Sequence, residues 1–140
     1  MAILLQADEV TIEKPDWGWH VLWGTQGQVI DEKYLALQRA DVFTEQDRRF
    51  GHDKPYIECC GQGWSWYGHI LLFELHRGCV KVQLDQEAAQ HMKNDGAIDV
   101  TFDLDDPGFL KLADALLMVF RGFNYYRSHA QPDRSSRETG

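Results

Sequence analysis

The segment GQGWSWYGH (residues 61–69) comes close to a pattern that performs nucleophilic catalysis. In the G-x-S-x-G elbow, a serine occupies a tight turn between a strand and a helix, where its hydroxyl group is exposed to the substrate. Here Tyr67 stands in place of the second glycine, and a strand is predicted to follow instead of a helix. No histidine and acid are recognisably arranged to serve Ser65. We therefore predict no catalytic residues and no enzyme activity.

The six histidines are the next candidates, because imidazole is a common metal ligand. None is paired with another at i, i+2 or i, i+4, and His69 and His76 would lie about 23 Å apart on opposite faces of one strand. The segment DLDDPG (103–108) has aspartates at the spacing of a calcium loop, but Pro107 occupies a position that requires an Asx residue. A zinc site would have to be assembled across strands. The sequence predicts isolated histidines, no metal site and no cofactor.

Two groups of side chains remain as candidates for binding a protein partner. The aromatic segment is one, because tryptophan and tyrosine dominate protein–protein hot spots. Its structural alternative is a set of half-buried rings at a strand entry, where the glycines allow a bend or bulge. The other group is an acidic stripe facing a basic partner, with a solvated strand face as its alternative. The candidate partner-binding residues are Trp64, Trp66, Tyr67, His69, Asp99, Asp103 and Asp105.

Strands must position most of these residues, because apolar side chains alternate along several short runs. In one run, Leu71, Phe73 and Leu75 are predicted to share a face, with Glu74 and His76 on the other. Turn residues separate the runs. Strands are predicted at residues 3–12, 17–23, 33–39, 55–60, 69–77, 79–85 and 97–106.

Three helical segments have recognisable starts. Thr44 and Asp85 are suited to cap short helices, the second of them over residues 86–92. Asp106 followed by Pro107 predicts the start of a longer helix, with the aspartate as its N-cap. Apolar residues at helical spacing after Pro107 give this last helix one face that must be buried.

Short connections between strands, followed by a late helix, predict an α+β fold that is predominantly β. We expect a curved antiparallel sheet of about six to seven strands, with the C-terminal helix packed on one face. Residues 1–123 are predicted to form a single domain. Residues 124–140 are polar and rich in serine and arginine, and we expect them to be a disordered tail.

The 140-residue chain is acidic, with a formal net charge of −8. This charge repels phosphate backbones, so no nucleic-acid binding is expected, and it would steer a basic protein toward the surface. The first residues, MAILLQADEV, have no basic n-region and too short an apolar run for a signal peptide or a membrane span. We therefore expect a cytoplasmic protein without membrane association.

Several segments occur in a characteristic order: YLALQR (34–39), FTEQDRRFGHDKPYIE (43–58), a Gln ahead of YG, FELHRGCVKVQLDQEAAQHM (73–92) and IDVTFDLDD (98–106). Their order and spacing resemble the tenth numbered family of immunity proteins from bacterial polymorphic toxin systems. The resemblance implies a small, mostly β cytosolic protein that binds a toxin domain and silences it without catalysis or cofactor. The residues that carry it are Tyr34, Leu35, Leu37, Gln38, Arg39, Gln46, Asp47, Gly51, Tyr56, Glu58, Gln62, Tyr67, Gly68, Asp103 and Asp105.

Toxin neutralisation is therefore the main hypothesis, and the acidic charge favours a basic toxin domain as the partner. One alternative is a small-molecule-binding domain with a deep pocket lined by Trp17, Trp19, Trp64 and Trp66. Another is a structural module that dimerises through exposed sheet edges, and a homodimer is also compatible with the main hypothesis.

Overall fold

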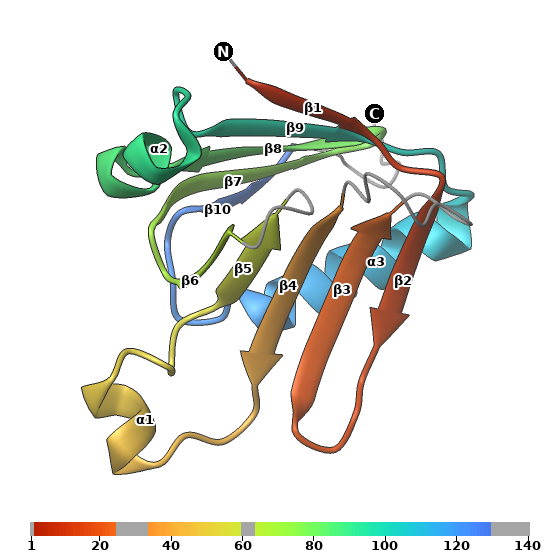
Figure 1. The fold of residues 1–140 in the computed structure, drawn as a ribbon. Helices are drawn as coiled ribbons and strands as arrows, with labels where there is room; N and C mark the ends of the chain where they lie inside the picture. Colours follow the sequence, from red (N-terminus) through yellow and green to blue (C-terminus); the bar gives the residue numbers. More distant parts are fainter. Residues whose placement is uncertain (1, 25–33, 60–63, 130–140) are drawn as a thin grey trace.

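The computed structural model describes residues 2–24, 34–59 and 64–129, which fold into two five-stranded sheets and three helices (Figure 1). In spatial order, sheet A contains β1 (Ile3–Gln6), β9 (Ala97–Thr101), β8 (Cys79–Leu84), β7 (Ile70–His76) and β10 (Tyr126–Ser128). Sheet B contains β2 (Glu9–Glu13), β3 (Gly18–Gly24), β4 (Leu35–Ala40), β5 (Tyr56–Cys59) and β6 (Trp64–Tyr67). The helices are α1 (Glu45–Arg49), α2 (Gln86–Met92) and α3 (Asp106–Val119).

The predicted class, α+β and predominantly β with a C-terminal helix, is confirmed. The strands form two sheets, however, where one sheet of about six to seven strands was expected. The predicted first strand is divided: the amide of Ala7 still donates to Thr101 of sheet A (2.8 Å), while that of Asp8 donates to Gly24 of sheet B (3.0 Å). Most pairs are antiparallel, as expected, but β1 with β9 and β10 with β7 are parallel.

One hydrophobic core is shared by both sheets and α3, which lies behind sheet B and below sheet A in Figure 1. Phe73 of sheet A lies 6.2 Å from Trp23 of sheet B and 4.7 Å from Phe120, just after α3, between ring centroids. The predicted apolar face of the last helix is confirmed. Its buried residues are Phe109, Leu112, Ala115, Leu116 and Val119.

The alternation predicted for β7 holds only in part. A register shift between Ile70 and Leu72 turns Leu71 outward, so that its side chain is 59% exposed, and Ile70 is buried instead. The prediction that Leu71 faces the core is therefore wrong, because a bulge changes the phase of the side chains. Beyond the bulge Phe73 is buried as predicted, and the β7 residues of the outer face are only half-buried.

The start of α3 is shifted by one residue from the prediction. Asp105, not Asp106, is the N-cap, and its carboxylate accepts a hydrogen bond from the amide of Gly108 (2.8 Å). Asp106 instead forms an ion pair with Arg77 (2.9 Å). Either aspartate could cap a helix whose first turn contains Pro107, so the sequence pattern did not distinguish them.

The folded chain continues past residue 123, where the polar tail was expected to begin. Tyr126 stacks on Phe120, with ring centroids 5.3 Å apart, and Tyr125 contacts the same ring edge-on at 5.6 Å. These contacts place β10 beside β7 at the edge of sheet A. Residues 124–129 therefore belong to the folded body, and residues 130–140 lie outside the described part of the chain.

These two tyrosines predict a loss of stability at alkaline pH. Burial raises the pKa of Tyr125 and of Tyr126 to about 12. Between roughly pH 10 and 12 the unfolded chain loses phenolic protons that the folded chain retains, so the free energy of unfolding should fall as the pH rises through this window. Circular dichroism during an alkaline titration measures it. Tyr126→Phe should show a shallower decline, and an identical decline in this variant would contradict the assignment.

Candidate functional site

The outer face of sheet B presents a row of polar and aromatic side chains. The antiparallel registers pair Tyr67 of β6 with Tyr56 of β5, Tyr56 with Gln38 of β4, and Gln38 with His20 of β3. Residues paired in this way share one face of a sheet. The opposite face of the same strands is buried in the core, so this row is the surface that sheet B offers to other molecules.

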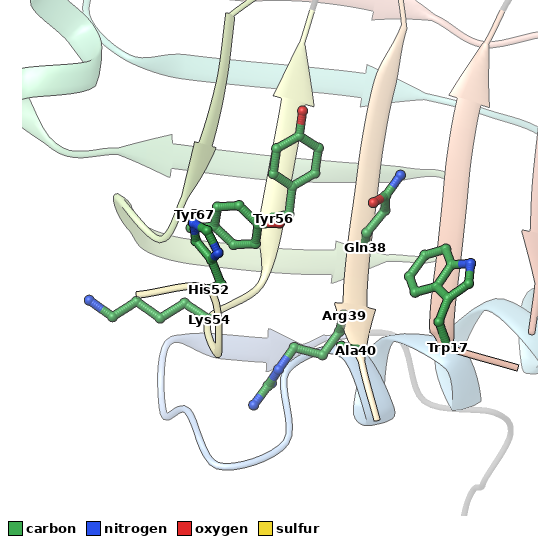
Figure 2. A pocket seen from close by; sticks show the side chains of 8 residues that line it. All are labelled: Trp17, Gln38, Arg39, Ala40, His52, Lys54, Tyr56 and Tyr67. Carbon is green, nitrogen blue, oxygen red and sulfur yellow. The ribbon is translucent and has the colours of Figure 1, made fainter. Parts of the chain in front are cut away.

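A depression of about 160 Å³ lies over one end of this row (Figure 2). Pockets for small molecules usually enclose roughly 300 to 1,000 Å³. The depression is therefore suited to receive one protruding side chain of a partner and is small for a metabolite. Its lining residues are Trp17, Gln38, Arg39, Ala40, His52, Lys54, Tyr56 and Tyr67.

Aromatic rings form a continuous group beside the depression. The rings of Tyr67 and His52 are stacked with centroids 4.4 Å apart, and Tyr56 lies 5.1 Å from Tyr67. Phe50 extends the group, with its ring 5.9 Å from that of His52. Trp17, Tyr67 and Phe50 are 48%, 42% and 61% exposed. Large rings that remain exposed are typical of protein-binding surfaces.

Local structure around α1 positions His52. Thr44 and Asp47 form a reciprocal capping box, and the hydrogen bond from the Thr44 amide is the main reason why the pKa of Asp47 is lowered. Gly51 then takes a positive φ of 78°, which turns the chain back after the helix. The amide of His52 donates to the carbonyl of Asp47 (2.7 Å). The ring of His52 is thereby held against β6.

The other side of the depression is formed by β3 and β4. A Cβ atom at Gly18 would collide with the carbonyl oxygen of Arg39, so glycine is needed for the two strands to approach here. The amide of Asp41 donates to the carbonyl of Trp17 (2.9 Å). Together these contacts place Trp17 at the rim.

Glu58 of β5 fixes the orientation of two tyrosines on this face. The hydroxyl groups of Tyr34 and Tyr56 both donate to its carboxylate, the latter over 2.7 Å. Burial raises the pKa of Tyr56, so its hydroxyl remains a donor at neutral pH. The tyrosine ring is therefore held in a single orientation at the wall of the depression.

Comparison with known protein families assigns the chain to one of them. The family model described as immunity protein 10 matches residues 6–110. The chain belongs to this family. No curated protein matches it. The match covers both sheets except β10 and most of β1, and it includes the whole lining of the depression.

Five residues that carried the resemblance to immunity proteins lie on this one face of sheet B. Gln38, Tyr56 and Tyr67 line the depression, and Tyr34 and Glu58 form the adjacent hydrogen-bond group. The aliphatic residues that carried it have another role, because they are buried in the core of the immunity protein. The residues that carry the resemblance therefore include both core residues that determine the fold and residues of a surface patch.

The aromatic segment of this immunity protein forms a strand, with its rings divided between two faces. Trp64 and Trp66 are half-buried against the core, as the structural alternative expected, and Tyr67 points outward. The chain turns afterwards, at Gly68 and His69, where φ is 85° and 67°. The glycines at 61 and 63, to which a bend was also assigned, lie outside the described residues. Only Tyr67 of the predicted aromatic group reaches the depression.

His69 is engaged within the immunity protein. Its Nδ1 atom lies 2.8 Å from the Oδ2 atom of Asp85, the N-cap of α2. Desolvation pushes the pKa of Asp85 upward, but hydrogen bonds from the Ala88 amide and the His69 ring outweigh it, so this pKa is lowered. The imidazole therefore links β7 to α2, and its role in binding a partner remains a prediction.

The three predicted aspartates do not join the depression. Asp99 lies in β9 of sheet A, paired with Lys81 across the strands, and is half-buried. Asp103 is exposed after β9, while Asp105 caps α3. The depression is built from sheet B and the loop after α1, so the acidic residues and the aromatic residues are separate features of the surface.

The pocket expected for the small-molecule alternative would require four tryptophans to converge. Trp19, Trp64 and Trp66 instead pack against the core, and Trp17 alone of the four lines the depression.

Sequence reasoning did not anticipate His52, Lys54 or Tyr56 as site residues. The alternation of β5 was the available signal for Tyr56, whereas His52 and Lys54 reach the site through a loop.

Within the described residues, no helix is both long and apolar enough to cross a membrane.

Proposed function

We propose that this immunity protein silences a cognate toxin domain by covering it with the outer face of sheet B, around the depression. The proposal rests on membership of the immunity protein 10 family, whose match spans the whole of this face. Inhibition takes place by protein–protein contact, without catalysis or cofactor. We place the complex in the cytoplasm, where the immunity protein meets its toxin.

The geometry favours a projecting toxin side chain as the central contact. A depression of about 160 Å³ accommodates one large side chain, and exposed rings surround it with apolar area. Lys54 forms no ion pair with the other described residues, so it is available to a carboxylate or carbonyl of the toxin. Tyr67 is the residue of the predicted aromatic group that we place at the centre of the contact.

The net charge of −8 contributes to the rate of association. An acidic surface accelerates encounter with a basic partner and accounts for less of the final affinity. We assign this role to exposed carboxylates outside the depression, such as Asp103. A basic toxin domain is therefore the expected partner, and raising the salt concentration should slow association more than it speeds dissociation.

Co-expression with the toxin domain encoded beside this gene tests the proposal. We expect the toxin domain to arrest growth when expressed alone, and the immunity protein to restore growth and to co-purify with it as a stable complex. A toxin domain from an unrelated system serves as the control and should not be captured. Continued growth arrest without a complex would contradict the proposal.

A further inference from the structure

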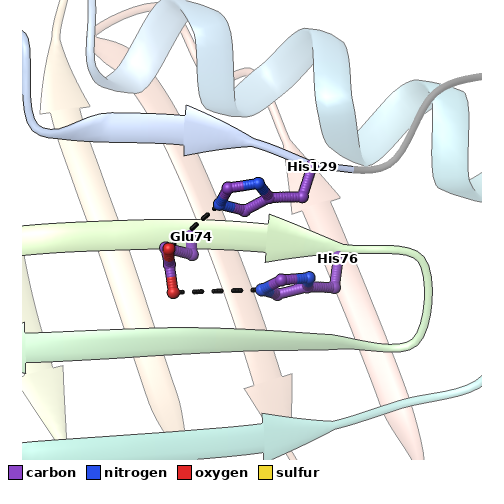
Figure 3. A group of neighbouring side chains, drawn as sticks. All are labelled: Glu74, His76 and His129. Carbon is purple, nitrogen blue, oxygen red and sulfur yellow. Dashed lines mark hydrogen bonds and ion pairs between the residues drawn. The ribbon is translucent and has the colours of Figure 1, made fainter.

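The outer face of sheet A carries a cluster of two histidines and a glutamate, away from the depression (Figure 3). Glu74 and His76 are neighbours on this face of β7. His129 is the residue directly after β10, the strand next to β7. Isolated histidines were expected from the sequence, because none is paired with another at i, i+2 or i, i+4. The pairing of β10 with β7 brings His129 and His76 together, with their rings stacked and their centroids 4.8 Å apart.

The ligand atoms are close to the spacing of a metal site. His129 Nε2 lies 2.9 Å from Glu74 Oε2, and His76 Nε2 lies 3.9 Å from Glu74 Oε1. One ligand atom from each side chain lies within 4.8 Å of the other two. In a tetrahedral zinc site, with bonds of roughly 2.0–2.1 Å, ligand atoms are about 3.3 Å apart. Figure 3 shows both rings directed at the carboxylate, so small ring rotations close the remaining gap.

Two observations indicate that the cluster is more than an ion pair. His76 Nε2 is buried and has no hydrogen-bond partner, since 3.9 Å is too long for a hydrogen bond to Glu74. Glu74 also has two cationic neighbours across the strands, Lys81 and Arg127, and forms no ion pair with either of them. Its carboxylate is directed at the imidazoles instead. A buried, unpartnered nitrogen aimed at a carboxylate is the arrangement that a cation completes.

We propose that Glu74, His76 and His129 bind a divalent transition-metal ion of the zinc class. Imidazole nitrogens select zinc and its neighbours over magnesium or calcium, which prefer oxygen ligands. The three side chains supply three ligands, and water fills the remaining position on this open face. The site lies on sheet A and does not depend on the function proposed for sheet B.

The ion acts as a clamp on the last strand of the sheet. Strand β10 has three residues and lies at the sheet edge. Its end is held by a hydrogen bond from the His129 amide to the Leu75 carbonyl (2.8 Å). A metal shared by His76 of β7 and His129 adds a cross-link at this point. Because the ion binds the folded arrangement, it shifts the local equilibrium toward the docked strand.

Isothermal titration of untagged, chelator-treated protein with zinc chloride tests the site. We expect saturable binding of one ion per chain and no binding of magnesium chloride. His76→Gln and His129→Gln should each weaken zinc binding by more than about 100-fold, since loss of outer-shell partners alone costs roughly 10- to 100-fold. His91→Gln, on the exposed side of α2, is the matched control and should leave affinity unchanged.

Hydrogen exchange at the end of β10, with and without zinc, tests the clamp. Zinc should slow exchange at the amide of residue 129, which donates to the Leu75 carbonyl of β7, in the wild-type protein and leave it unchanged in His129→Gln. Lys81→Gln should strengthen zinc binding, because a cation opposite Glu74 is removed. The proposal is overturned by absence of saturable zinc binding, by wild-type zinc affinity in both histidine variants, or by zinc binding that leaves exchange at the end of β10 unaltered.

Discussion

Replacing Trp17 and Tyr67 together with alanine should weaken the toxin complex by at least about 100-fold. Each ring is a large, exposed side chain at the rim of the depression, and hot-spot residues of this kind contribute roughly 2 kcal/mol or more on truncation. One such contribution already exceeds a tenfold change in affinity. Dissociation constants from calorimetry or biolayer interferometry measure the effect, and most of it should appear in the dissociation rate.

Matched variants separate loss of the contact from loss of the fold. Leu71→Ala and Leu117→Ala remove side chains that are each 59% exposed outside the depression, and they should bind the toxin like the wild-type protein. Tyr67→Phe retains the stacked ring over His52 and should lose much less affinity than Tyr67→Ala. If the Trp17 and Tyr67 double variant folds normally and binds the toxin undiminished, the depression is not the contact.

Local signals in the sequence predicted the elements well, because their physical causes are local. Thr44 and Asp85 each accept a hydrogen bond from a backbone amide three residues ahead, so their helices begin where the sequence indicates. Alternation predicted the buried faces of β8 and β9 for the same reason, since side chains on a strand reach opposite faces in turn.

Features that depend on contacts between distant segments were not predictable in this way. The division of residues 3–12 between two sheets depends on Thr101 and Gly24, which accept the hydrogen bonds at the crossing point. The short strand β10 forms because Tyr126 packs on Phe120, although its surroundings in the sequence are polar. A local pattern contains neither of these partners.

The same limit applies to the candidate sites. The sequence predicted Tyr67 as a candidate partner-binding residue, but its neighbours His52 and Tyr56 come from a loop and from an adjacent strand. The cluster of Glu74, His76 and His129 depends on β10, because the pairing of β10 with β7 brings His129 beside His76. Cross-strand register therefore assembles both sites, and register is fixed by the fold as a whole.

A buried arginine provides the clearest case of an interaction between distant segments. Arg39 of β4 is 7% exposed, and its Nη1 donates to the carbonyls of Val119 (2.7 Å) and Arg121 (3.1 Å) at the end of α3. The rings of Phe43 and Phe123 each lie 5.1 Å from the guanidinium. Burial, followed by the nearby charge of Arg121, lowers the pKa of Arg39. The cation remains favourable here because the C-terminal end of a helix is electronegative.

Arg39→Met should lower the free energy of unfolding by about 3 kcal/mol, as measured by urea denaturation. Hydrogen bonds from a charged donor contribute roughly 1.5–3 kcal/mol each, and the variant leaves the two carbonyls without that donor, although it avoids the cost of burying a charge. Arg39→Lys keeps the charge but not the planar guanidinium, so its loss should be intermediate. If Arg39→Met proves as stable as the wild-type protein, the desolvation cost equals the gain. In that case Arg39 does not anchor α3 to sheet B, and the apolar contacts of the helix alone hold it there.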